Sequence, residues 1–86
     1  MNVKFSNKFI KLFDQSPESI KQLFDEKLQI FMLDKFDARL NNHQLSGKLK
    51  GLRSINVGGD WRALFEELPN GDVIFRVIGT HSQLYK

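Results

Sequence analysis

The spacing of apolar residues changes near the middle of this 86-residue chain. In the first half, apolar side chains recur every three or four residues, as at Phe9, Leu12 and Phe13, which is the period of an amphipathic helix. In the second half, runs of β-branched and aromatic residues are separated by turn sequences typical of β-hairpins, at residues 58–59 (Gly-Gly) and 69–71 (Pro-Asn-Gly). The sequence therefore predicts an α+β fold, with helices followed by strands.

Two helices are predicted in the first half, after a short strand at residues 3–5. Ser6 is well placed to cap the first helix. A Ser-Pro-Glu sequence at residues 16–18 marks the start of the second, because it offers a capping hydroxyl, a proline with helical φ and an acid at the positive end of the helix dipole. The helix that follows is expected to end near residues 33–35.

Three strands are predicted in the second half, at residues 52–57, 61–68 and 72–79, and they form an antiparallel meander. Alternation along them gives the sheet one largely apolar face. We therefore expect a helical pair packed on one face of a small antiparallel sheet. Since 41% hydrophobic content is enough for one core only, residues 1–86 are expected to form a single domain.

The expected register follows from a two-residue turn at Gly58-Gly59. This turn pairs Ile55 with Arg62 and Arg53 with Leu64. If Leu64 then pairs with Arg76 in the second hairpin, the three arginines share the face of the sheet away from the helices. A register change of one residue would invert this arrangement.

Composition excludes several classes of protein. The absence of cysteine rules out a disulfide scaffold, a cysteine nucleophile and a thiolate zinc site, and it fits a cytoplasmic protein. Two histidines leave little for a metal cage, so neither a metal nor another cofactor is expected. The longest apolar run, residues 30–33, is far shorter than the roughly 20 residues of a membrane-spanning helix, so no membrane partner is expected.

Positive charge is concentrated in one part of the chain. The whole sequence has a formal net charge of +3, and residues 43–62 alone account for a charge of +3. The basic residues of this window are Lys48, Lys50, Arg53 and Arg62. Together with Arg76 they could hold a phosphate backbone through planar guanidinium groups and ammonium charges. The alternative is an ordinary solvated sheet face.

His43, Asp60 and His81 are candidates for proton transfer, because each lies at the edge of a predicted element. Histidine suits both proton roles in RNA cleavage, since one group must deprotonate a ribose 2′-hydroxyl and another must protonate the leaving 5′-oxygen. Basic side chains would stabilise the charge that develops on the phosphate. Spacing permits this metal-independent mechanism, and it equally permits simple binding of RNA or of an acidic partner.

Three segments carry a resemblance to a known family. They are residues 43–53 (His-Gln-Leu-Ser-Gly-Lys-Leu-Lys-Gly-Leu-Arg), 59–62 (Gly-Asp-Trp-Arg) and 79–85 (Gly-Thr-His-Ser-Gln-Leu-Tyr). In this order they resemble the RelE/ParE superfamily of bacterial toxin–antitoxin toxins, and most of all the YafQ-type mRNA interferases. The resemblance implies a RelE-like, microbial-RNase-like fold and an endoribonuclease toxin that cuts mRNA in the ribosomal A site and is neutralised by a cognate antitoxin.

The resemblance also implies roles for individual residues. His43, Asp60 and His81 match family positions for acid–base catalysis, and Tyr85 matches an aromatic near the cleavage site. Lys50 and Arg53 match basic positions that hold RNA. An acidic antitoxin segment is expected to cover the arginine face or to displace the C-terminal tail.

Two residues keep other interpretations open. Asn56 stands where the YafQ pattern has a further histidine, and asparagine cannot transfer protons near neutrality. One alternative is therefore an inactive relative that only binds an antitoxin, and another is a non-enzymatic ParE-like toxin that inhibits DNA gyrase. Trp61 matches an aromatic of the family motif, where either core packing or base stacking would account for it.

Overall fold

The computed structural model describes residues 1–85. Its strands are β1 (Val3–Phe5), β2 (His43–Gln44), β3 (Arg53–Gly58), β4 (Trp61–Glu67) and β5 (Val73–Thr80). Its helices are α1 (Asn7–Asp14), α2 (Glu18–Leu33) and α3 (His81–Leu84), with short 3₁₀ helices η1 (Ala38–Leu40) and η2 (Gly47–Leu49) between α2 and β3. The predicted α+β fold is confirmed. None of the helices in this described part of the chain is long and apolar enough to cross a membrane.

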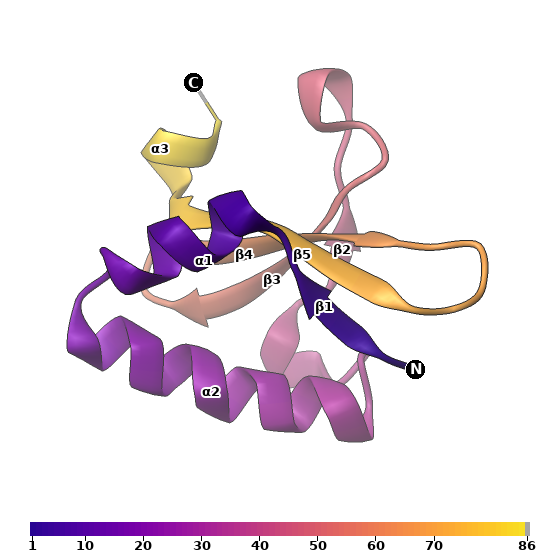
Figure 1. Ribbon diagram of the computed structural model, residues 1–86, viewed down its shortest axis with the longest axis horizontal. Helices are drawn as coiled ribbons and strands as arrows, with labels where there is room; N and C mark the ends of the chain where they lie inside the picture. Colours follow the sequence, from indigo (N-terminus) through magenta and orange to yellow (C-terminus); the bar gives the residue numbers. More distant parts are fainter. Residues whose placement is uncertain (86) are drawn as a thin grey trace.

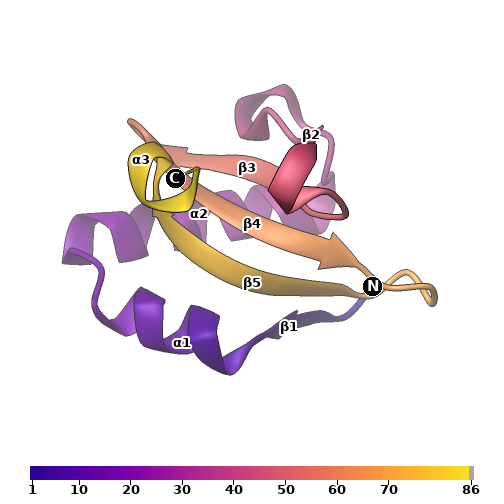
Figure 2. The same cartoon turned by 90° about the horizontal axis from the view of Figure 1, so that it is seen from above.

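The strands form one sheet in the order β1-β5-β4-β3-β2. The predicted meander of β3, β4 and β5 is present, and the sheet is mixed because β1 pairs in parallel with β5. Figure 1 shows α2 beneath one face of the sheet, whereas α3 and the segment around η2 rise from the opposite face. Seen from above, α1 runs beside the β5 edge (Figure 2).

We call the side covered by α2 the helix face and the opposite side the open face. The helix face presents buried apolar side chains from the three central strands: Ile55, Val57, Ala63, Phe65 and Phe75. The open face presents Ser54, Asn56, Arg62, Leu64 and Val77, of which Ser54 and Leu64 are fully buried and the others partly buried. The phenylalanine-rich core therefore lies on the helix face.

Phenylalanine rings make up much of the core under the helix face. Phe75 lies at its centre, with ring centroids 5.4 Å from Phe24, 5.6 Å from Phe31 and 5.7 Å from Phe9. Such tilted and edge-on pairs each contribute about 0.5–1.5 kcal/mol beyond the burial of area. This cluster ties α1 and α2 to β5, the strand that leads directly into α3.

The two helices begin close to the predicted positions, although their caps differ. Ser6 caps α1 as expected, because its Oγ accepts a hydrogen bond from the Phe9 N–H at 3.0 Å. The prediction that Ser16 caps α2 is wrong. Pro17 occupies the N-cap position, and the Ser16 hydroxyl instead donates to the Leu12 carbonyl at the end of α1, at 2.8 Å.

The register of the β3–β4 hairpin differs from the prediction by one residue. The turn consists of Gly59 and Asp60, and Gly59 adopts a φ of 54°, which glycine reaches at little cost. Ile55 consequently pairs with Ala63, and a bulge follows at Val57. This register buries Ile55 and Val57 completely on the helix face.

The prediction that three arginines share one face is therefore wrong. Arg53 pairs with Phe65 on the helix face, and Arg62 pairs with Asn56 on the open face. In the second hairpin, Leu64 pairs with Val77 rather than with Arg76, which lies in a register shift between β4 and β5. Val77 thus shares the open face with Leu64.

Candidate nucleic-acid interface

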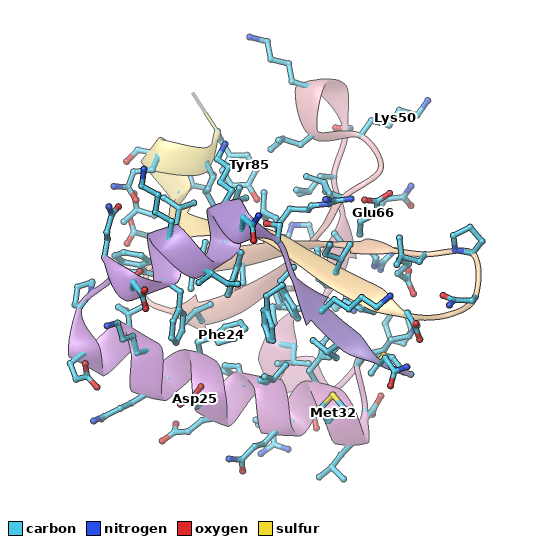
Figure 3. All side chains as sticks on the ribbon, in the orientation of Figure 1. Phe24, Asp25, Met32, Lys50, Glu66 and Tyr85 are labelled. Atoms are coloured by element: carbon cyan, nitrogen blue, oxygen red, sulfur yellow. The ribbon has the colours of Figure 1, made fainter. Side chains whose placement is uncertain are left out.

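A groove crosses the open face between the η2 segment and α3. One part, of about 300 Å³, is lined by Ser46, Lys48, Leu49, Leu84 and Tyr85. A second part, of about 360 Å³, shares Leu49 and Leu84 and has Leu64 and Val77 among its lining residues. Figure 3 shows Lys50, Glu66 and Tyr85 on this side of the sheet, opposite Phe24, Asp25 and Met32. Of the predicted site residues, Lys48 and Tyr85 line this groove.

Asp60 and His81 are brought together next to Tyr85, which lines the groove. The His81 backbone N–H donates to the Asp60 carbonyl at 2.8 Å, so the β3–β4 turn and the start of α3 are joined. The His81 ring packs against Tyr85, with centroids 4.4 Å apart. Both Asp60 and His81 are exposed, and a substrate can therefore reach them.

A reciprocal capping box fixes the direction in which α3 leaves the sheet. The Thr80 Oγ1 accepts from the Gln83 N–H at 3.3 Å, and the Gln83 Oε1 accepts from the Thr80 N–H at 2.9 Å. These bonds satisfy backbone donors that a helix start would otherwise leave unpaired. The box therefore positions His81, the first residue of a helix only four residues long.

His43 lies apart from this pair. It pairs with Ser54, and Ser54 precedes Gly58 by four residues, which places His43 about 13 Å from the turn along β3. Its Nδ1 is 2.8 Å from the Asn41 carbonyl oxygen. Because a carbonyl can only accept, Nδ1 carries a proton and donates it to this bond, which leaves Nε2 as the ring nitrogen that the bond does not engage.

The predicted basic residues differ in how far their charges are engaged. Lys48 and Lys50 are exposed, and neither forms an ion pair with another residue of the described chain. Arg62 folds back on the turn and donates to the carbonyls of Gly59 and Trp61, at 2.8 and 2.9 Å. Arg76 is paired with Glu66 at 2.6 Å. Among the predicted basic residues, the two lysines thus have the most available charges.

Arg53 is positioned by the helix side of the molecule. Its Nε donates to Asn42 Oδ1 at 2.8 Å, and its guanidinium lies 5.5 Å from the centre of the Phe36 ring. Trp61 likewise packs against the core, which favours the core-packing interpretation of that residue. Neither side chain belongs to the floor of the groove.

Comparison with known proteins decides the family. A model of the bacterial type II toxin–antitoxin toxin YafQ matches residues 1–86. The chain belongs to this toxin family. The comparison with curated protein sequences gives no match.

Solved toxin structures share the fold of this YafQ-family chain. The crystal structure of YafQ from E. coli strain BL21(DE3) superposes with a TM-score of 0.81 at 19% identity, covering 99% of this chain and 98% of that one. The E. coli DinJ–YafQ complex gives 0.71 at 24% identity, covering 99% and 98%. The RelB–RelE antitoxin–toxin complex from Methanococcus jannaschii gives 0.74 at 17% identity, covering 95% and 94%. The predicted RelE-like fold is confirmed.

The segments that carry the resemblance to YafQ toxins all border the open face. Residues 43–53 form β2 and the η2 segment, residues 59–62 form the turn and the start of β4, and residues 79–85 lead into α3. Within residues 1–85, no group of three or more His, Cys, Asp or Glu side chains is arranged to hold a metal ion.

Two polar residues of the open face received no site role in the sequence analysis, where Asn56 was named only as a departure from the YafQ pattern. Ser54 and Asn56 alternate with the buried Ile55 and Val57 along β3, and Ser54 is fully buried. Ser54 Oγ and Asn56 Oδ1 are both inaccessible, and neither has a hydrogen-bond partner among the residues that the structure describes. The alternation of polar and apolar residues along β3 would have placed both on the open face, had the register of the hairpin been known.

Proposed function

We propose that this YafQ-family protein is a ribosome-dependent endoribonuclease toxin that acts on mRNA in the cytoplasm. One observation carries the proposal: the exposed His81 packs against Tyr85, which lines the groove, and is joined to the Asp60 turn, while Lys48, which forms no ion pair within residues 1–85, lines the same groove. A proton donor and a cation thus border the same surface, as metal-independent cleavage of RNA requires.

In the proposed reaction, the ribose 2′-oxygen attacks the adjacent phosphorus while the bond to the 5′-oxygen breaks. The free Nε2 of His43 accepts the 2′-hydroxyl proton, because its Nδ1 is held by the Asn41 carbonyl. His81, beside Asp60, protonates the leaving 5′-oxygen. The products are a 2′,3′-cyclic phosphate and a 5′-hydroxyl.

The basic side chains hold the RNA in this scheme. Lys48 and Lys50 contact phosphates as mobile point charges, and Arg62 and Arg76 join them on exchanging the turn carbonyls and Glu66 for phosphate. Arg53 contributes by fixing the start of β3, which it does through Asn42 and Phe36. Tyr85 offers a ring on which a base can stack.

The proposed protein partner is a cognate antitoxin, as in the DinJ–YafQ and RelB–RelE complexes. An acidic segment would be attracted to Lys48 and Lys50 and would cover the groove. Co-expression with the product of an adjacent reading frame should abolish toxicity. If the protein stays fully toxic when the products of all adjacent reading frames are co-expressed, this would count against a cognate antitoxin.

The proposed activity is tested with a defined mRNA in a reconstituted bacterial translation system, with cleavage mapped by primer extension. The wild type should cut only translated codons, and His81→Ala should not cut. A variant on the far side of the molecule, Gln22→Ala on α2, should cut like the wild type. Normal translation without cuts would exclude the proposed endoribonuclease activity. Inhibition of purified DNA gyrase would then support the ParE-like alternative.

A further inference from the structure

The chain between η1 and β2 is fixed by one half-buried asparagine. The Asn42 Nδ2 donates to the Lys35 carbonyl at 2.8 Å, and the Asn42 Oδ1 accepts from the Arg53 Nε–H at 2.8 Å. Because a carbonyl only accepts and a guanidinium only donates, these two partners allow one orientation of the amide. The residue that directly precedes His43 is therefore tied both to the segment after α2 and to the start of β3.

The groups that hold Asn42 are themselves engaged. The Arg53 guanidinium and the Lys35 ammonium each lie 5.5 Å from the centre of the Phe36 ring, and Lys35 is also paired with Glu67 at 2.6 Å. Such contacts between cations and a ring are favourable. The Arg53 side chain is thus oriented by Phe36 as well as by Asn42.

Asn41 has an unusual backbone conformation. Its φ of 48° and ψ of 47° are left-handed, and within residues 1–85 no other residue except glycine has a positive φ. Its own N–H is bonded to the Ala38 carbonyl, and Leu40 before it is fully buried. Since ψ sets the direction of a residue's own carbonyl, this conformation directs the Asn41 carbonyl to the His43 ring, where the Nδ1 lies 2.8 Å away.

We propose that Asn41 and Asn42 are positioning residues for His43. Asn42 holds the left-handed turn at Asn41, and the Asn41 carbonyl keeps the hydrogen of the neutral ring on Nδ1. A neutral imidazole has one nitrogen that donates and one that accepts, so this bond leaves Nε2 as the acceptor. The inference rests on the proposed function, in which Nε2 accepts the 2′-hydroxyl proton, and it gives Arg53 a role through Asn42 rather than through RNA.

The test measures which ring nitrogen of His43 carries the hydrogen, by two-bond ¹H–¹⁵N NMR on protein with ¹⁵N-labelled histidine. All proteins carry His81→Ala, so that His43 is the only histidine of the chain. The pH is raised until the ring is neutral and its spectrum no longer changes. The reference protein should show mainly the Nδ1–H form. Asn42→Ala should lower the ratio of the Nδ1–H to the Nε2–H form about fivefold, as expected for the loss of one hydrogen bond.

Asn70 provides a matched control, because its amide is also bonded at both ends. Its Nδ2 donates to the Asp72 carboxylate at 3.1 Å and its Oδ1 accepts from the Asp72 N–H at 3.0 Å, in the turn between β4 and β5. Asn70→Ala should leave the ratio unchanged.

Two variants of Asn41 test the backbone conformation separately. Asn41→Gly keeps access to a positive φ and should preserve the ratio, whereas the β-branched side chain of Asn41→Val disfavours this conformation and should lower it. A ratio that changes equally in both variants would show that the Asn41 side chain, and not its carbonyl, holds the ring, and this would overturn the inference.

The inference and the proposed function can fail separately. A reference protein with mainly the Nε2–H form, or an Asn42→Ala variant with a lower Tm and an unchanged ratio, overturns the inference even if mRNA is cut during translation. In proteins that retain His81, Asn42→Ala should lower the maximal cleavage rate about fivefold without changing KM, and a change in KM alone would overturn the positioning role. If no mRNA is cut but the ratio depends on Asn41 and Asn42, the positioning of His43 stands and the nuclease does not.

Discussion

Among single residues, Gly58 determines how closely α2 can approach the sheet. A Cβ at this position would lie 2.6 Å from Cδ1 of Leu23, a distance at which one of the two groups must move. Leu23 packs against the core from α2, and Gly58 is the last residue of β3 before the turn that carries Asp60. A methyl group at Gly58 would therefore act on both the core and the candidate site.

We expect Gly58→Ala to lower the free energy of unfolding by about 1–3 kcal/mol, because the added methyl group overpacks the interface with α2. Urea unfolding measures the change. In a Leu23→Ala background the same substitution should cost much less, since the contact has been removed. Equal costs in the two backgrounds would show that the methyl group acts elsewhere.

Asp37 gives the stability of the protein a dependence on acidic pH. Hydrogen bonds from the Arg39 guanidinium lower the pKa of this carboxyl from 3.8 to about 2. Because the pKa is lower in the folded state, the stabilisation is complete above about pH 4 and is lost as the pH falls from 4 to 2. Asp37→Asn should reduce the slope of unfolding free energy against pH in this range, measured by urea titrations at each pH. Equal slopes of unfolding free energy against pH for the wild type and Asp37→Asn would contradict this role of Asp37.

For the secondary-structure elements, local sequence patterns were sufficient to predict type and extent, but not pairing. Apolar periodicity and the Ser6 cap located α1 and α2, and the turn sequences located β3, β4 and β5 to within about a residue. The register was missed because Gly58-Gly59-Asp60 contains two overlapping two-residue turns, and only the second of them buries Ile55 and Val57 on the helix face.

The parts of the site that depend on pairing were missed for the same reason. Arg53 was predicted on the open face, and its true position depends on Asn42 and Phe36, which no local pattern connects to it. The two-residue strand β2 is too short to have a period of its own. His81 and Asp60 were selected because each lies at the edge of a predicted element and matches the family motif, whereas their contact is a product of the fold.

The capping box of α3 leads to a prediction for this element. Thr80→Ala removes the oxygen that accepts from the Gln83 N–H, and loss of such a cap costs about 1 kcal/mol. We expect faster amide exchange in α3 and slower mRNA cleavage, because His81 loses its fixed direction. Thr80→Ser keeps the hydroxyl and should behave like the wild type. Unchanged exchange in Thr80→Ala would show that packing alone holds α3.

Across the whole molecule, the candidate binding residues and the phenylalanine core lie on opposite sides of one sheet. The helix face buries the phenylalanine cluster, and the open face lies between exposed lysines and the exposed His81. Since an open antiparallel sheet needs only one covered face for stability, the other can carry binding residues. Substitutions at the lysines should therefore change binding without changing the fold.

Replacing Lys48 and Lys50 together by glutamine should weaken RNA binding most at low salt. For single strands, each lost phosphate contact lowers the slope of log K against log salt by about 0.7, so the pair should lower it by about 1.4. Filter binding across a series of salt concentrations measures the slope. Lys27→Gln, on α2, should leave it unchanged, and an unaltered slope in the double variant would exclude phosphate contacts by the two lysines.

The parallel pairing of β1 with β5 also sets the order in which the molecule can be assembled during synthesis. Val3 and Val73 are register partners, so the first strand made has no place in the sheet until the last strand has been made. Contacts this distant in sequence slow folding. His81 and Tyr85 follow β5 directly, and their emergence coincides with closure of the core. A nascent chain therefore has neither a finished core nor a complete groove, and an antitoxin has no intact groove to cover before β5 and α3 are translated.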